Sequence, residues 1–191
     1  MNIICTAGVD EVGVYLPDVL VLPERTSIAG LMTASSRWPD AIVVGAVEEN
    51  PHIRGYALKR CVNQIDYLKF STDSNSIGTL DASSVKCTCE SGDIALGVLI
   101  CKDFQQIDLR TRVIERVVSS KARFKVVCIP ADMGTEWFPN DSVQYFVGAY
   151  LAMSNNRNTR NPTRRRSFIT GPNGVCLISQ SNDESISFSA H

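Results

Sequence analysis

Histidine is scarce in this sequence: its 191 residues include only two, His52 and His191. Sites that use several histidines, such as most zinc hydrolase centres and Ser-His-Asp triads, are therefore nearly excluded. The sequence also lacks an apolar run near the ~20 residues that a membrane helix needs. Residues 1–22 show no basic segment followed by a long apolar one, which a secretory signal would have. We expect no membrane association.

An excess of charge of either sign is also missing. Lys and Arg total 19 against 20 for Asp and Glu, a net charge of −1. No overall charge draws such a chain to nucleic acid or to an anionic membrane, so nucleic-acid binding is not expected. Residues 157–166 do hold five arginines. This cluster is either an anion site or a solvated basic loop, and it has no interleaved aromatic residue to stack on single-stranded bases.

Cysteine, in contrast, is abundant, with seven residues, an odd number. A secreted disulfide framework would have an even number and a signal peptide, so we expect thiols in a reducing compartment, the cytoplasm. Cys87-Thr88-Cys89 has no second Cys or His pair and is a poor zinc site; it indicates an alternating strand with both thiols on one face. Neither a metal nor another cofactor is predicted.

The composition and the apolar pattern favour one layered α/β domain over residues 1–191. Hydrophobic residues make up 44% and charged residues 20%, enough for a sizeable core. Short runs, rich in Val and Ile and apolar on both faces, are typical of strands buried inside such a fold. They are Val19–Leu22, Ala41–Val47, Ile94–Cys101, Lys125–Pro130 and Val147–Met153, and helical stripes are predicted over Thr26–Ser36 and Phe104–Ala122.

Turn residues predict two antiparallel pairs and three irregular segments. Asn63-Gln64 separates the strand-like runs 54–62 and 65–70, and Gly171–Gly174 separates 167–170 from 175–179. Polar loops are expected over Ser71–Ser84 and Asn155–Arg166, and a weakly ordered tail over 181–191.

Cys101 stands out among the thiols because it ends a buried strand immediately before an amphipathic helix. Free backbone N–H groups and the positive helix end at such an elbow favour a thiolate and a developing oxyanion. The plainer interpretation is that Cys101 is the last buried residue of its strand.

Glu24 and Lys69 lie at the ends of two further predicted strands. Alone, Glu24 is interpretable as a helix cap and Lys69 as a solvated edge lysine. Together with Cys101 they supply a nucleophile, a base and a cation at three strand ends.

The order Pro23-Glu24, then Tyr67-Leu68-Lys69, then Gly-Val-Leu-Ile-Cys-Lys-Asp over 97–103 resembles the nitrilase, or carbon–nitrogen hydrolase, superfamily. Segments 125–130, 149–155 and 167–177 fit the same pattern, so the resemblance runs from about Tyr15 to Ile178. It implies a four-layer α-β-β-α sandwich in the α/β class, whose copies pair through the helix after Cys101 into a homodimer or larger homo-oligomer. The chain would be a shortened member, because its first strand–helix unit is abbreviated.

The resemblance also implies a hydrolase that cleaves non-peptide C–N bonds of a small amide or nitrile. Cys101 would be the nucleophile that forms a thioester, Glu24 the general base and Lys69 the electrostatic partner. The backbone N–H of Lys102 would assist the oxyanion. Trp137, which follows the strand at 125–130, is a candidate for lining the substrate site, although an exposed or interface aromatic is the alternative.

Two departures from the family pattern leave a second hypothesis open. The N-terminal unit is short, and residues 71–84 contain no glutamate where many members have one, only Asp73 and Asp81. The alternative is a catalytically weak or inactive nitrilase-like module that binds a small ligand or a partner protein.

Overall fold

The computed structural model describes residues 1–7, 9–70, 86–132, 148–155, 166–181 and 185–191. These residues contain two α-helices, two 3-10 helices and thirteen strands. The elements are β1 (Asn2–Cys5), the 3-10 helix η1 (Val9–Val12), β2 (Val19–Glu24), α1 (Ile28–Arg37), β3 (Ile42–Glu49), β4 (His52–Lys59), β5 (Val62–Asn63), β6 (Tyr67–Leu68), β7 (Thr88–Ser91), β8 (Ile94–Val98), the 3-10 helix η2 (Cys101–Gln105), α2 (Ile107–Ser119), β9 (Phe124–Ala131), β10 (Tyr150–Asn155), β11 (Arg166–Thr170), β12 (Cys176–Ser181) and β13 (Ile186–Ser189).

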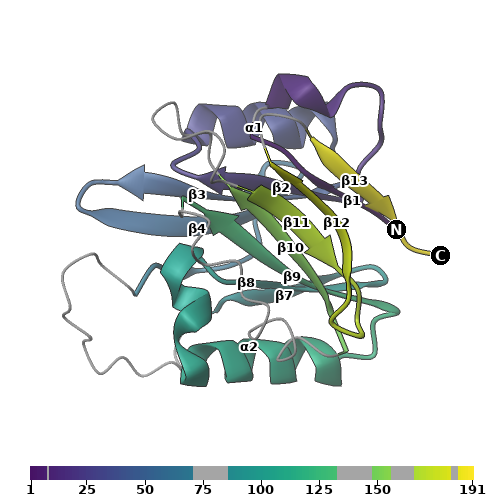
Figure 1. Cartoon of the computed structure of the whole chain (residues 1–191). Helices are drawn as coiled ribbons and strands as arrows, with labels where there is room; N and C mark the ends of the chain where they lie inside the picture. Colours follow the sequence, from purple (N-terminus) through teal and green to yellow (C-terminus); the bar gives the residue numbers. More distant parts are fainter. Residues whose placement is uncertain (8, 71–85, 133–147, 156–165, 182–184) are drawn as a thin grey trace.

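The described strands form two mixed sheets that face each other. The first has the order β13-β1-β2-β3-β4-β5, with β6 paired to β4, and the second has the order β12-β11-β10-β9-β8-β7. Strands β1, β2 and β3 run parallel, as do β8, β9 and β10. Helix α1 lies on the outer side of the first sheet and α2 on the outer side of the second (Figure 1). The predicted four-layer α-β-β-α sandwich is confirmed.

Strand β2 shows why the apolar runs are continuous. Its odd-numbered side chains, Val19 and Val21, lie in the core between the two sheets. Its even-numbered ones, Leu20 and Leu22, face α1, whose Leu31 packs in the same outer cluster. Because successive side chains of a strand point to opposite faces, a strand covered on both sides has to be apolar throughout.

At Gly97 of β8, helix α2 packs closely against the second sheet. A Cβ placed on Gly97 would lie 2.5 Å from Val113 Cγ1 and 3.0 Å from Val117 Cγ2. We expect Gly97→Ala to lower the free energy of unfolding by ~1–3 kcal/mol, because the added methyl group overpacks a filled interface. Urea denaturation measures the change.

The matched control for Gly97→Ala is the same substitution in a Val113→Ala background. Removing the two Val113 methyl groups makes room for the new Cβ, so Gly97→Ala should cost less there than in the native chain. An equal cost in both backgrounds would show that crowding against α2 is not the cause.

Several predicted boundaries move in the structure. Strand β8 ends at Val98, three residues before Cys101, and the helix expected from Phe104 is split into η2 and the later α2. The run predicted over 147–153 is β10, which is described from Tyr150, and the Gly171–Gly174 hairpin is confirmed as β11 and β12. The predicted loop at 71–84 and most of that at 155–166 lie outside the described residues.

The turn predicted at Asn63-Gln64 is wrong. The chain reverses at Arg60 and Cys61, which both have positive φ, and Asn63 instead closes β5, where its Oδ1 accepts a bond of 3.1 Å from the Ala57 N–H. Strand β4 also pairs with β3 through a hairpin around Asn50-Pro51 that the apolar pattern did not reveal.

The tail predicted over 181–191 is also wrong for its later part. Strand β13 pairs antiparallel with β1, Ile186 is buried, and the Met1 ammonium donates to the Ala190 carbonyl at 2.8 Å. The two ends of the chain consequently lie side by side (Figure 1).

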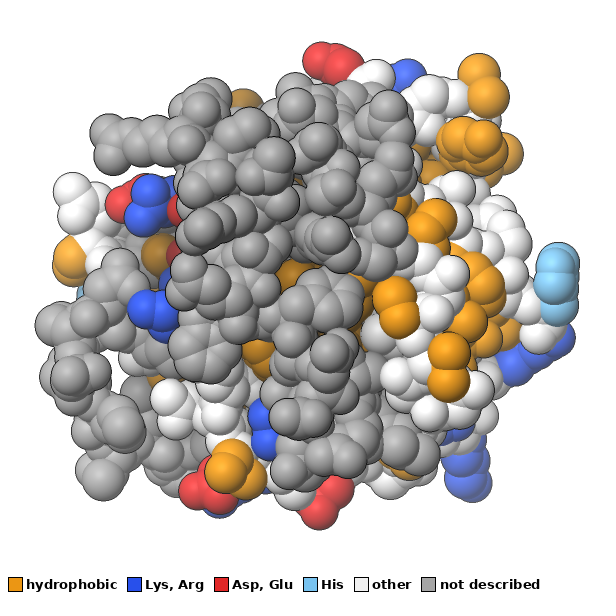
Figure 2. Space-filling model, viewed as in Figure 1, with side chains coloured by type: hydrophobic (Ala, Val, Ile, Leu, Met, Phe, Trp, Pro, Cys, Tyr) orange, Lys and Arg blue, Asp and Glu red, His pale blue; other side chains and the backbone are white. Residues whose placement is uncertain are grey.

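The space-filling view from the same side shows hydrophobic side chains reaching the surface among polar ones (Figure 2). None of the described helices is both long and apolar enough to span a membrane.

Candidate functional site

Glu24 is the last residue of β2, where a proline shapes the strand end. The β2–β3 register shifts between Val21 and Glu24, as expected where Pro23 has no N–H to donate. Arg25 then adopts a positive φ of 65° and turns the chain away. Glu24 is left 2% exposed, with its carboxylate inside the protein.

Lys69 follows β6, and the alternation of this strand directs it inward. Tyr67 is fully buried, whereas Leu68 between them is exposed. The Lys69 N–H donates to the Ile53 carbonyl at 2.8 Å, which extends the pairing with β4 beyond Leu68. Two residues apart on an extended chain, Tyr67 and Lys69 share one face.

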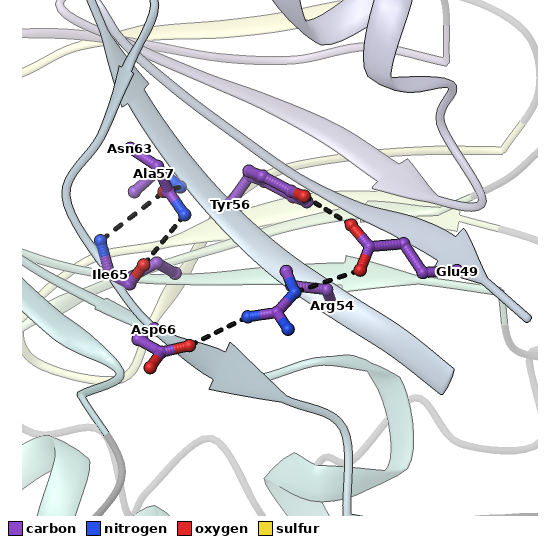
Figure 3. Close-up of polar contacts among 7 residues, drawn as sticks. All are labelled: Glu49, Arg54, Tyr56, Ala57, Asn63, Ile65 and Asp66. Carbon is purple, nitrogen blue, oxygen red and sulfur yellow. Dashed lines mark hydrogen bonds and ion pairs between the residues drawn. The ribbon is translucent and has the colours of Figure 1, made fainter. Parts of the chain in front are cut away.

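A polar network lies on the face of β4 that points away from Tyr67, and it links the residue before β6 to the first sheet (Figure 3). Arg54 bonds Asp66 just before β6 at 2.8 Å and Glu49 of β3 at 3.1 Å, and the Tyr56 hydroxyl donates to the same glutamate. Arg54 joins β3, β4 and the start of β6, and so supports the strand that presents Lys69. The Tyr56–Glu49 bond lies within the β3–β4 hairpin and does not reach β6.

Cys101 occupies a tight elbow between β8 and α2. The Leu99 N–H still donates to the Cys128 carbonyl of β9 at 3.0 Å, but Cys101 itself has a φ of +51°, in the left-handed region that non-glycine residues rarely adopt. The 3-10 helix η2 begins there, and Cys101 is 3% exposed. Such strained backbone is typical of functional positions.

The structure brings Glu24, Lys69 and Cys101 together; we call these residues the triad. Lys69 Nζ lies 2.7 Å from Glu24 Oε1, and the lysine side chain is 12% exposed. The other carboxylate oxygen, Oε2, is buried and has no hydrogen-bond partner among the described residues. It is therefore available to a reacting group.

The surroundings keep the Cys101 thiol protonated. Burial first, and the negative charge of Glu24 second, raise its pKa to about 12, whereas the Lys69 ammonium and the backbone N–H of Lys102 act in the opposite direction. A thiol in this setting needs a base to become a nucleophile. The adjacent carboxylate can serve as that base, and the ammonium and the Lys102 N–H can stabilise negative charge.

The other predicted site residues lie outside the described residues. These are Trp137, Asp73 and Asp81, together with four of the five arginines over 157–166. In the described part of the chain, no group of three or more His, Cys, Asp or Glu side chains is arranged to hold a metal ion.

Sequence reasoning gave no role to three residues that the structure places at or near the triad. Asp132 follows β9 and lies 3.6 Å from Arg25, which brings the carboxyl ends of β2 and β9 together. Tyr67 and Asp103 are buried and bonded to each other. Tyr67 is the first residue of the Tyr-x-Lys motif and Asp103 the last of the Cys-x-Asp motif, and this placement was the signal in the sequence that could have identified them.

Among known proteins, similarity to this chain was found in solved structures. No protein-family model matches the sequence, and no curated protein matches it. Among solved structures, Nit3 of Saccharomyces cerevisiae, a nitrilase superfamily member, aligns with a TM-score of 0.64 and 14% identity over 98% of this chain and 89% of its own. A glutamate-to-glutamine mutant of the amidase from Nesterenkonia sp. AN1, with acrylamide added to its active-site cysteine, gives 0.64 and 14% over 98% and 91%.

A third similar structure is XC1258 of Xanthomonas campestris, a CN-hydrolase superfamily protein with an arsenic adduct in its active site. It gives a TM-score of 0.65 and 14% identity over 98% of this chain and 89% of that one. Identities this low establish architecture alone. The chain has the fold of the nitrilase superfamily.

Proposed function

We propose that this chain hydrolyses a non-peptide C–N bond of a small amide or nitrile through a thioester on Cys101. The observation that supports this most strongly is the buried Lys69–Glu24 ion pair beside the Cys101 thiol. An ion pair in low dielectric is costly to bury, so it is rarely retained for stability alone. The similarity in fold to amidases adds to the argument.

In the first half of the reaction, Glu24 takes the thiol proton as the sulfur attacks the substrate carbon. The C–S bond forms and the carbonyl oxygen becomes an oxyanion, which Lys69 and the Lys102 N–H stabilise. The intermediate then collapses: the C–N bond breaks, Glu24 passes its proton to the leaving nitrogen, and ammonia or an amine departs. A thioester remains on Cys101.

In the second half, Glu24 removes a proton from water, which attacks the thioester carbon. The C–S bond breaks, the proton returns to the thiol, and a carboxylic acid leaves. A nitrile would first give a thioimidate, and one water molecule would convert this to the same thioester with release of ammonia. Each proton is returned, so the reaction needs no cofactor.

One observation favours the alternative, a module that binds a ligand without turning it over. The same burial that shapes the site raises the pKa of the Cys101 thiol and leaves this residue only 3% exposed. A thiol that no substrate reaches would be inert packing.

Ammonia release from a panel of short aliphatic and aromatic amides and nitriles tests the proposal. Turnover of at least one compound, at a rate proportional to enzyme concentration, supports the hydrolase. A panel on which nothing is released, while ligands still raise the thermal midpoint, would favour the binding module.

We also propose that the chain forms a homodimer or larger homo-oligomer through α2. This helix exposes Ile107 and, in part, Val118. We expect light scattering to give at least twice the monomer mass of 21.0 kDa, and Ile107→Asp to lower the mass towards one copy. A native chain that stays monomeric at micromolar concentration would contradict this prediction.

Location in the cytoplasm stays a prediction from the cysteine content.

A further inference from the structure

Tyr67 and Asp103 form a buried contact between the two sheets. Both residues are 0% exposed, and the Tyr67 hydroxyl donates to Asp103 Oδ2. The same oxygen accepts the Phe70 N–H at 3.0 Å, and the Tyr67 hydroxyl oxygen accepts the Ile100 N–H at 3.2 Å. The phenol is thus bonded to the chain on both sides of Cys101.

The contact links Lys69 and Cys101, which follow strands of different sheets, and it lies next to the isolated β-bridge between Asp66 and Lys86. Lys69 follows β6, which pairs with β4 of the first sheet, and Cys101 follows β8, which pairs with β7 and β9 of the second. Tyr67 is two residues before Lys69, and Asp103 is two residues after Cys101. Phe70, the residue after Lys69, is held by Asp103 as well. Lys69 therefore lies between two residues, Tyr67 and Phe70, that both donate hydrogen bonds to Asp103 of the cysteine elbow.

The position of the phenol is fixed by packing as well as by hydrogen bonds. A Cβ on Gly55, the strand partner of Tyr67, would lie 2.9 Å from the Tyr67 ring and 3.2 Å from Ile100 Cδ1. Only glycine leaves room for the ring at this position. Burial first, and the charge of Asp103 second, raise the pKa of Tyr67 well above its usual value, so the hydroxyl keeps the proton that it donates.

We propose that the Tyr67–Asp103 pair consists of positioning residues that set the place of the Lys69 ammonium relative to Cys101. The inference rests on the proposed function, because it concerns the same triad. A shift of the ammonium by about 1 Å weakens its effect on a developing negative charge, since fixed charges act only where they are aimed. The pair acts on the chemistry through Lys69.

A double-mutant cycle with Tyr67→Phe and Lys69→Met tests the inference. The readout is the rate of Cys101 alkylation by iodoacetamide between pH 7 and 10, followed by peptide mass mapping, and it needs no substrate. Lys69 lowers the pKa of Cys101, so Lys69→Met should reduce the thiolate fraction and slow alkylation about tenfold. Tyr67→Phe should slow it about threefold to tenfold in the native background, and by less than about 1.5-fold once Lys69 is gone.

The matched control is Tyr56→Phe. It removes the same hydroxyl from a tyrosine that also donates to a carboxylate, Glu49, but on the far face of β4. It should leave Cys101 alkylation unchanged. The exposed Cys176 gives an internal reference rate for each variant.

Should Tyr67→Phe fail to fold, Asp103→Asn replaces it. Asparagine keeps an oxygen that can accept from Tyr67 and Phe70, so a smaller slowing is expected, again lost in the Lys69→Met background. Equal slowing in both backgrounds would overturn the positioning role and leave the proposed function intact. If Lys69→Met itself leaves Cys101 reactivity unchanged, the triad and the inference fail together.

Discussion

Replacing Cys101 by alanine is expected to abolish ammonia release from every amide or nitrile that the native chain hydrolyses, by about 10³-fold or more. Without the sulfur no thioester can form, and the remaining Glu24–Lys69 pair can only assist direct attack by water. Initial rates at saturating substrate measure the loss.

Cys176→Ala is the control for this substitution, since Cys176 is an exposed thiol on the β11–β12 hairpin. It should keep full activity. A Cys101→Ala variant that stays folded and retains activity within tenfold of the native rate would remove Cys101 from the reaction.

Glu24→Gln is expected to move turnover and thiol reactivity in opposite directions. Loss of the general base should lower kcat by about 10²–10⁴-fold. The same change removes the negative charge that raises the pKa of Cys101 and leaves the Lys69 ammonium unpaired beside the sulfur. The pKa should then fall from about 12, and alkylation of Cys101 at pH 8 should become faster.

The pH profile of alkylation gives the sign of this effect. In the native chain the thiolate forms only as the pH approaches about 12, so the rate should keep rising to the alkaline limit of the assay. In Glu24→Gln the rise should come at lower pH. Glu48→Gln, an exposed glutamate of β3, is the control and should leave the profile in place. An unmoved profile in Glu24→Gln, or one moved to higher pH, would mean that Glu24 does not act on Cys101.

The layers of the fold were predictable because strands that are buried on both faces have continuous apolar runs in the sequence. Val19–Leu22 and Ala41–Val47 are apolar at every position, which a strand covered on both sides requires. The places of Glu24 and Cys101 followed from the same runs, because each stands where a run ends. The triad could then be named from strand ends and motif order.

Contacts between distant segments were less predictable. Strand β13 is short, and Ile186 alternates with serine at the edge of a sheet, a pattern that also suits a loose tail. The reversal at Arg60 and Cys61 uses positive φ at residues that carry no turn signal. The Tyr67–Asp103 bond joins two sheets, and neither local propensity nor periodicity reports on such a pair.

The most direct test of the proposed mechanism is the mass of the Cys101 peptide after rapid acid quench during turnover of an active amide. We predict an added mass equal to the acyl group of the substrate less the hydrogen that it replaces, found on Cys101 and absent in Cys101→Ala. Turnover with no acyl group on Cys101 at any quench time, under conditions that trap a model thioester, would contradict the account.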